Sequence, residues 1–532
     1  MDSKFYKYQV APFFLGLLSL YIALIVYFDN TNITTTNGLY KAMDTYGWEM
    51  GTKFAVDSGG LLYAFTMGMI SKLIPDFLVN FYGNAIDFVA HRKLAWIHSV
   101  FGTGSSAAVF ILAYHVTKDK LWAFGVALIH AFSSFILINS IISEDIMPGY
   151  FFFTLSVLFL YKALEGEKVR LCLSLSTLSV VAMLLFHWTL LPPLAASYLV
   201  LACFLSYHDR RYLRLFIEQL LLLFAVIFVF VILANFFAAG RYPKNLSVWG
   251  TLYPSKAGPS SWVGFGWNKV WQFYPGIGGY LVPQLLISWV VTLASIGVLL
   301  ASFFKEEKLF TKSLALFGLS IFLFGQLQNL YGQAADPQFE IQPMFLVTIA
   351  CISLYFVVSV KRYIRVVLPI LGLIIAGNNF IKLQPARFGD SILIQGFKEF
   401  RREFPKESTR IVHLAYEGWG TWLMIFDYHG DFKEYLKEVT CLNTPFHFTP
   451  GIDAKRAADE IMAEIDQAFA SGKRVIATTP WTSPDGVYDL LAQNVTREEA
   501  TELRDILLKN YKIKATYKVT WGEFAEIEKR GS

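Results

Sequence analysis

Long apolar stretches alternate with short polar gaps over the first 380 residues of the chain. A bilayer core about 30 Å thick needs roughly 20 apolar residues in a helix, and the stretches at 10–28 and 213–238 meet this need. The pattern predicts an α-helical, multi-pass integral membrane domain with about eleven transmembrane helices. No small-residue cleavage site follows the first stretch, so we expect it to be retained. The helices are expected at 10–28, 95–116, 121–139, 148–164, 171–187, 189–206, 213–238, 281–303, 313–330, 343–360 and 363–378.

Lysine and arginine gather in every second gap between these stretches, whereas the gaps at 140–147 and 331–342 contain neither. Cytoplasmic loops carry an excess of Lys and Arg. This predicts a cytoplasmic N-terminus and, after an odd number of spans, an extracytoplasmic C-terminal part. The basic gaps hold Lys118 and Lys120, Lys168 and Arg170, Arg210 and Arg211, Lys305 and Lys308, and Arg362 and Arg365.

Two apolar regions are interpreted from this charge pattern. A membrane crossing at 61–74 would place every later basic gap on the outer side, so we expect a juxtamembrane amphipathic helix there, within the first outer loop. The region 169–208 could form one overlong helix or two short helices separated near His187 and Trp188. Two helices preserve the charge alternation, and we expect two.

The last third of the chain has a different composition. The whole chain is 55% hydrophobic and 16% charged, yet half of the charged residues follow Phe380. We therefore expect a transmembrane domain at 1–380 and a small, extracytoplasmic, soluble α/β domain at 381–532. In the second domain, strands are expected at 410–414, 473–479 and 513–520 and a helix at 496–511.

Net charge and cysteine content exclude several classes of protein. The formal charge of +5 is small and reflects the cytoplasmic loops, so we expect no nucleic-acid partner. The four cysteines are scattered along the chain, which gives neither a disulfide framework nor a zinc motif.

Acidic residues beside the outer ends of helices are the first candidates for catalysis. Asp29 directly follows the first helix, and Asp44 lies further along the first outer loop. Glu144 and Asp145 are adjacent in a very short loop, and carboxylates at membrane depth are costly and often functional. Structural interpretations also apply. Asp29 and Asp44 could be solvated loop residues, and Glu144 or Asp145 could cap the following helix.

The outer loop at 239–280 combines cations with aromatic rings and contains no Asp or Glu. Such a loop could hold a phosphate while its rings rest on lipid or sugar, or it could be an interfacial aromatic belt. His187 and Gln338, near the ends of other helices, are further candidates for substrate binding, although a lone histidine is more often a packed residue. The candidates in the loop itself are Arg241, Tyr242, Lys244, Lys256 and Lys269.

Short motifs accompany these candidates at 58–63 (SGGLLY), 140–145 (SIISED), 187–189 (HWT), 336–340 (DPQFE) and 415–422 (AYEGWGTW). Their order resembles the GT-C superfamily of membrane glycosyltransferases. The first four are similar to elements of aminoarabinose transferases and protein O-mannosyltransferases. The fifth is similar in position to the acceptor-binding motif of oligosaccharyltransferases. Two features depart from the superfamily, since no acid stands near Thr36 and Asn37, and Gln338 replaces a common cation.

The resemblance implies a glycosyltransferase of the cell envelope that uses a sugar linked to polyprenyl phosphate or diphosphate. One of the outer carboxylates would accept the proton of a lipid, glycan or protein acceptor, and Arg241 or Lys244 would steady the leaving phosphate. We expect no cofactor and do not favour a divalent metal, because the loop at 239–280 supplies no acid. We expect a bacterial or archaeal plasma membrane rather than the endoplasmic reticulum.

Two other hypotheses stay open. A transporter or flippase of lipid-linked sugars would also carry membrane carboxylates, although the broken helices and inverted repeats typical of that class are not evident in the sequence. A non-catalytic protein that only binds lipid-linked sugars would account for the missing first-loop acid.

Overall fold

The structure of the protein is a computed structural model. It describes residues 5–28, 63–79, 89–142, 146–166, 168–187, 191–238, 281–282, 284–306, 308–329, 341–358, 363–388, 399–400, 402–412, 454–477, 497–519 and 522–531. These residues form a large helical bundle and a small α/β unit.

Each predicted span corresponds to a helix or a helix pair. Among the described helices, eight are long and apolar enough to cross a membrane, or nine if the bent pair α6–α7 counts as one span, and α16 is a shorter apolar helix. The chain is a multi-pass integral membrane protein, as predicted. The helices are α2 (Ala11–Phe28), α5 (Val89–Thr117), α6 (Lys120–Phe132), α7 (Ser134–Ile141), α8 (Ile146–Leu164), α9 (Val169–Phe186), α10 (Leu191–His208), α11 (Arg211–Ala238), α14 (Leu285–Lys305), α15 (Leu309–Asn329), α16 (Ile341–Val357) and α17 (Val367–Phe388).

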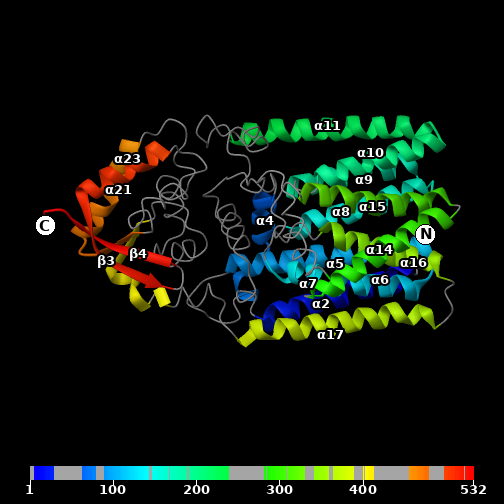
Figure 1. The fold of residues 1–532 in the computed structure, drawn as a ribbon, viewed down its shortest axis with the longest axis horizontal. Coiled ribbons are helices and arrows are strands. Elements are labelled where there is room, and N and C mark those ends of the chain that lie inside the picture. Colours follow the sequence, from blue (N-terminus) through cyan, green and yellow to red (C-terminus); the bar gives the residue numbers. More distant parts are fainter. Residues whose placement is uncertain are drawn as a thin grey trace.

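The bundle has two distinct ends (Figure 1). The N-terminus lies at one end, and α4 (Tyr63–Ser71) lies at the other, on the side of the α/β unit. We call this second end the α4 end. The basic gaps lie together at the N-terminal end, where ion pairs join them. Lys118 Nζ is 3.8 Å from Glu165 Oε1, and Arg365 Nε is 2.9 Å from Asp119 Oδ2. Which end faces the cytoplasm stays a prediction from the positive-inside rule.

The structure confirms two helices in the region 169–208 and a short helix within the region 61–74, but this short helix has no separate polar and apolar faces and so is not the amphipathic helix that was predicted. The region 169–208 forms two helices, α9 and α10, with His187 directly after the first. Part of the region 61–74 forms α4, which crosses the end of the bundle instead of running along it (Figure 1). Met67 of α4 packs against Leu94 of α5 and Phe186 of α9 in one buried cluster.

The single helix predicted at 121–139 is wrong. A break at Ser133 bends α7 by 60° from α6. The physical reason is that distant segments supply hydrogen-bond partners for the backbone groups that the break leaves free. Further along, α17 runs to Phe388, past the domain boundary predicted after residue 380. The division into two domains stays a prediction.

A mixed four-stranded sheet forms the α/β unit, which confirms the predicted α/β class and three of its strands, whereas β4 was not predicted. The strand order is β1-β2-β4-β3, with β1 and β2 parallel and the other neighbours antiparallel. α21 (Ala454–Ala470) and α23 (Arg497–Asn510) cover one face through side chains such as Ile465 and Leu507, and the other face carries Phe404 and Phe524. The strands are β1 (Thr409–Val412), β2 (Arg474–Ala477), β3 (Tyr511–Val519) and β4 (Gly522–Lys529).

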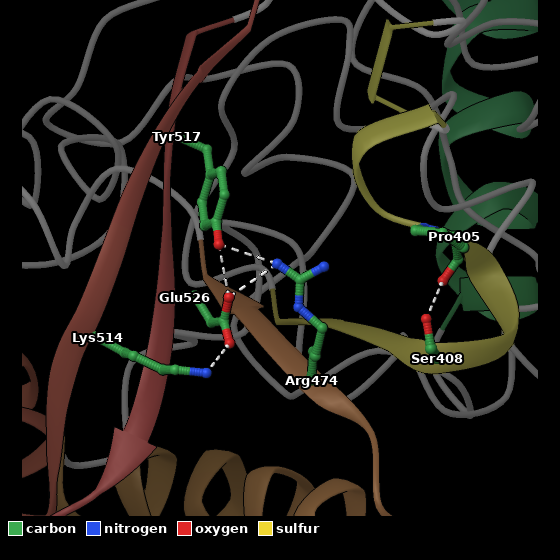
Figure 2. A network of polar contacts seen from close by, with 6 residues as sticks. All are labelled: Pro405, Ser408, Arg474, Lys514, Tyr517 and Glu526. Carbon is green, nitrogen blue, oxygen red and sulfur yellow. Dashed lines mark hydrogen bonds and ion pairs between the residues drawn. The ribbon is translucent and has the colours of Figure 1, made fainter.

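A charged network lies on the sheet, centred on Glu526 of β4 (Figure 2). The Glu526 carboxylate is 5% exposed and accepts hydrogen bonds from Arg474 at 2.8 Å, Lys514 at 2.7 Å and Tyr517 at 2.8 Å. Lys514 stands at a register shift between β3 and β4, and such bulges redirect side chains. Burial alone would raise the pKa of Glu526, but these donors outweigh burial and lower it to about 2.

Candidate functional site

Only one of the predicted site residues, His187, lies among the described residues. The structure does describe the helix ends from which several of the predicted loops start, and these ends show how the candidate residues are supported. Outside the described residues lie Asp29, Asp44, Glu144, Asp145, Arg241, Tyr242, Lys244, Lys256, Lys269 and Gln338, whose roles stay predictions.

His187 closes α9 at the α4 end of the bundle. Its backbone N–H donates to Met183 O at 2.6 Å, and the residue is 2% exposed. Gly149 of α8 lies directly against it, because a Cβ added to this glycine would be 2.6 Å from His187 Cβ. The described contacts therefore place His187 in the packing of α8 on α9. A contact of its ring with substrate stays a prediction.

A buried histidine that sequence reasoning did not select connects three segments at the α4 end. His98 of α5 has its Nε2 2.8 Å from the hydroxyl oxygen of Tyr63, which opens α4. Its Nδ1 is 2.9 Å from the carbonyl oxygen of Ile142, which follows α7. All three residues are at most 1% exposed. The start of α4 and the residue before the acidic loop 143–145 thus meet on α5.

Two buried cations lie near the start of α5, at the same end. Arg92 and Lys93 are each 3% exposed. Lys93 Nζ is 2.6 Å from Asp76 Oδ1, and Arg92 Nη1 donates to Val79 O at 3.4 Å. Buried cations are costly unless they are paired or hydrogen-bonded. Cations on the predicted extracytoplasmic side also depart from the positive-inside trend, and this departure is the sequence signal that could have identified them.

Side chains from other segments hold the break between α6 and α7. A helix break inside a membrane frees backbone groups, which must find partners within the protein. The Ser133 hydroxyl caps the N-terminus of α7. The side-chain amide of Asn379, on α17, donates to Phe132 O at 2.8 Å and to Leu281 O at 2.9 Å. The break therefore lies beside the residue that follows the cationic loop 239–280.

Close packing on α5 fixes the position of α7 between these two anchors. Gly102 of α5 lies directly against Ser140 of α7, and a Cβ at this glycine would overlap the serine hydroxyl. Small residues let membrane helices approach closely in this way. The α4 end thus combines buried cations with a helix whose end is held next to the acidic loop 143–145. Such an arrangement offers cations that can bind an anionic group.

The side chains that could bind a metal ion are dispersed over the described residues. Among the described residues, no three His, Cys, Asp or Glu side chains stand close enough together to hold a metal ion. The predicted acidic loops lie outside these residues, so the expectation about metals stays a prediction.

No family model matches the chain, and no curated protein matches it. A solved structure does match, namely the crystal structure of ArnT from Cupriavidus metallidurans bound to undecaprenyl phosphate. The match covers 97% of this chain and 98% of ArnT, with a TM-score of 0.52 and 11% sequence identity. At this identity the likeness shows the fold alone. The chain therefore has the fold of ArnT, and the resemblance that its motifs implied is confirmed as a likeness of fold.

Proposed function

We propose that the protein transfers a sugar from a polyprenyl-phosphate carrier to an acceptor at the α4 end of the bundle. The ArnT-like fold supports this proposal, and the ArnT crystal structure was bound to undecaprenyl phosphate. The main observation in its support is that two buried cations, Arg92 and Lys93, lie next to each other in the sequence at this end. Arginine and lysine bind phosphate oxygens through charge-assisted hydrogen bonds, and an apolar bundle is a suitable neighbour for a polyprenyl chain.

In the proposed reaction, an acceptor oxygen bonds to the anomeric carbon of the sugar. The bond between that carbon and the phosphate oxygen breaks, and the bonding electrons leave with the polyprenyl phosphate. One of the predicted carboxylates takes the acceptor proton, with Asp29 and Asp145 as the first candidates. The phosphate gains negative charge in this step, so cations stabilise the transition state more than the ground state. Arg92 and Lys93 would share this role with Arg241 or Lys244.

Turnover of defined carriers tests the proposal. The purified protein in nanodiscs would be given radiolabelled pentoses and hexoses linked to polyprenyl monophosphate, with a lipid extract as acceptor. We expect release of polyprenyl phosphate and movement of the label to the acceptor. Asp29→Asn and Asp145→Asn should each be tested, and undiminished turnover in both would remove their catalytic roles.

Substitution of the two cations tests the phosphate site separately. Arg92→Gln and Lys93→Gln should each lower kcat/KM for the carrier about tenfold, through a higher KM and a lower kcat, the equivalent of about 1.4 kcal/mol. Arg214→Gln is a matched control, because Arg214 pairs with Glu218 at the N-terminal end of the bundle, where no carrier phosphate is expected. An equal change of kcat/KM in all three variants would argue against a phosphate site at Arg92 and Lys93.

One observation favours a second candidate function. The break between α6 and α7 resembles the broken helices of transporters, so a flippase of lipid-linked sugars is the alternative. In that class the break lies near the bilayer midplane, whereas here 13 residues precede it and 8 follow it, which places it toward the α4 end. A carrier that is bound and moved between leaflets, but never cleaved, would support the flippase.

A further inference from the structure

We infer that His98 is a positioning residue that fixes the acidic loop 143–145 relative to α4. The inference rests on the proposed function, in which this loop supplies a carboxylate. Among the described residues, His98 hydrogen-bonds with both segments, with Tyr63 at the start of α4 and with Ile142 directly before the loop. The two bonds are 2.8 and 2.9 Å long. Tyr63 and Ile142 are each at most 1% exposed.

The Ile142 carbonyl fixes which ring nitrogen of His98 carries a proton. A backbone carbonyl can only accept a hydrogen bond, so His98 Nδ1 must carry the proton that Ile142 receives. In the neutral ring, Nε2 is then an acceptor, and the Tyr63 hydroxyl donates to it. Turning the ring over would put carbon atoms in place of both nitrogens. Both bonds therefore select a single orientation of His98.

The bond to Ile142 matters because of where α7 ends. The last carbonyl groups of a helix lack partners within the helix, and Ile142 is the C-terminal cap of α7. At the other end, the Ser133 cap and the Asn379 amide hold the break. With eight residues, α7 is only about 12 Å long. Loss of the His98 bond would release the end that leads directly into Glu144 and Asp145.

A shift at this point would affect the chemical step more than binding. Misplacement of a catalytic group by about 1 Å can cost about 100-fold in rate. The carrier phosphate, by contrast, would be held by cations on α5 itself, which does not move when α7 is released. We therefore expect loss of the His98 anchor to lower kcat while KM stays nearly constant.

Two amide substitutions separate the two bonds of His98. His98→Asn puts an amide nitrogen where Nδ1 stands and keeps the donor for Ile142. His98→Gln extends the amide toward Tyr63 and removes that donor. We expect kcat to fall about 10- to 100-fold in His98→Gln and less than about threefold in His98→Asn, with KM within about threefold in both.

His130 provides a matched control. It is also fully buried, and its ring nitrogens lie 3.0 Å from Ser106 Oγ and 3.1 Å from the Tyr150 hydroxyl. Among the described residues, its hydrogen bonds run to α5 and α8 and not to α4 or α7. His130→Gln should lower thermal stability about as much as His98→Gln but leave kcat within about threefold. An equal fall of kcat in both variants would overturn the inference, because general loosening of the bundle would explain it.

A distance measurement tests the positioning role without any assay of transfer. Spin labels would be placed at Met69, which is 51% exposed on α4, and at Ser143, in a chain whose four native cysteines are replaced. We expect a distance distribution that broadens in His98→Gln and stays narrow in His98→Asn. An unchanged distribution in His98→Gln overturns the inference. Broadening in a protein that transfers no sugar supports it while rejecting the proposed function.

Discussion

Two networks, one in the membrane bundle and one in the α/β unit, each provide hydrogen-bond partners for a buried polar side chain. The bundle uses neutral partners, whereas the α/β unit uses charged ones. In the bundle, His98 joins Tyr63 and Ile142 through bonds that require no charge. In the α/β unit, Glu526 is ionised and gathers two cations and a hydroxyl. Both centres are almost fully buried, at 0% and 5% exposed.

The difference follows from what lies around each network. Water can reach the cations around Glu526, since the side chains of Arg474 and Lys514 are 35% and 54% exposed. Solvent therefore lowers the cost of keeping three charges together. Tyr63 and Ile142, which hydrogen-bond with His98, are at most 1% exposed, and charge is far more costly inside a membrane. In the bundle, neutral hydrogen bonds thus join separate segments at His98, whereas charge stabilises the sheet around Glu526.

Glu526→Gln should have the largest effect on stability. It removes the carboxylate that Arg474 and Lys514 share and leaves two cations facing each other, which we expect to cost about 3 kcal/mol. Hydrogen exchange of peptides covering 511–529 in the full chain measures this loss. Glu528→Gln is the control, because that carboxylate forms an exposed pair with Lys512 worth less than about 1 kcal/mol. Equal effects of both substitutions would contradict a special role for Glu526.

Acid should weaken the same network in the unmodified protein. The folded pKa of Glu526 is about 2, below the ordinary value of 4.5. The folded state therefore binds the proton less tightly, so the stabilisation is complete above about pH 4.5 and is lost as the pH falls toward 2. About 2 kcal/mol should be lost by pH 3. Hydrogen exchange at pH 6 and pH 3, corrected for intrinsic rates, measures the loss. It should be absent in Glu526→Gln, and a persisting pH effect would assign it to other groups.

The sequence was a good guide to the bundle because a membrane span is a local property. Residue 187 separates α9 from α10 where the charge pattern required two helices. The break at Ser133 could not be predicted in this way. Its stabilising partner, Asn379, lies 247 residues further along the chain than Phe132. Hydrophobicity reports where a helix can cross the membrane, but not which distant amide satisfies a broken one.

The candidate site shows the same limit. A histidine in an apolar stretch has the appearance of a packed residue, and the partners of His98 stand 35 and 44 residues away. Only Arg92 and Lys93 left a signal, as cations on the side predicted to be poor in them. The predicted acids lie in loops outside the described residues, so their grouping stays a prediction.

Asn379→Ala extends the comparison to the helix break. The substitution removes two neutral hydrogen bonds from a residue that is 2% exposed. Such bonds between membrane helices average about 0.6 kcal/mol each, so we expect a loss of about 1–2 kcal/mol. Thermal unfolding in detergent measures it. Asn378→Ala is the control, since the Asn378 amide donates to the Asn379 side chain among the described residues, and its loss leaves both backbone carbonyls with their donor. A larger loss in Asn378→Ala would show that the break does not depend on Asn379.

A matched pair of Tyr→Phe substitutions compares the two networks directly, with the smallest expected effects. Each removes one hydroxyl and keeps the ring. Tyr63→Phe leaves a buried nitrogen of His98 that water reaches with difficulty, and we expect a cost of about 1 kcal/mol. Tyr517→Phe leaves Glu526 with two cationic donors near solvent, so the cost should stay below about 0.5 kcal/mol. Thermal unfolding of the first variant and hydrogen exchange of 511–529 in the second give these values. The reverse order would mean that His98 finds a new partner in the bundle when Tyr63 is lost. In that case its bond to Ile142, and not the chain of two bonds, would carry the positioning role.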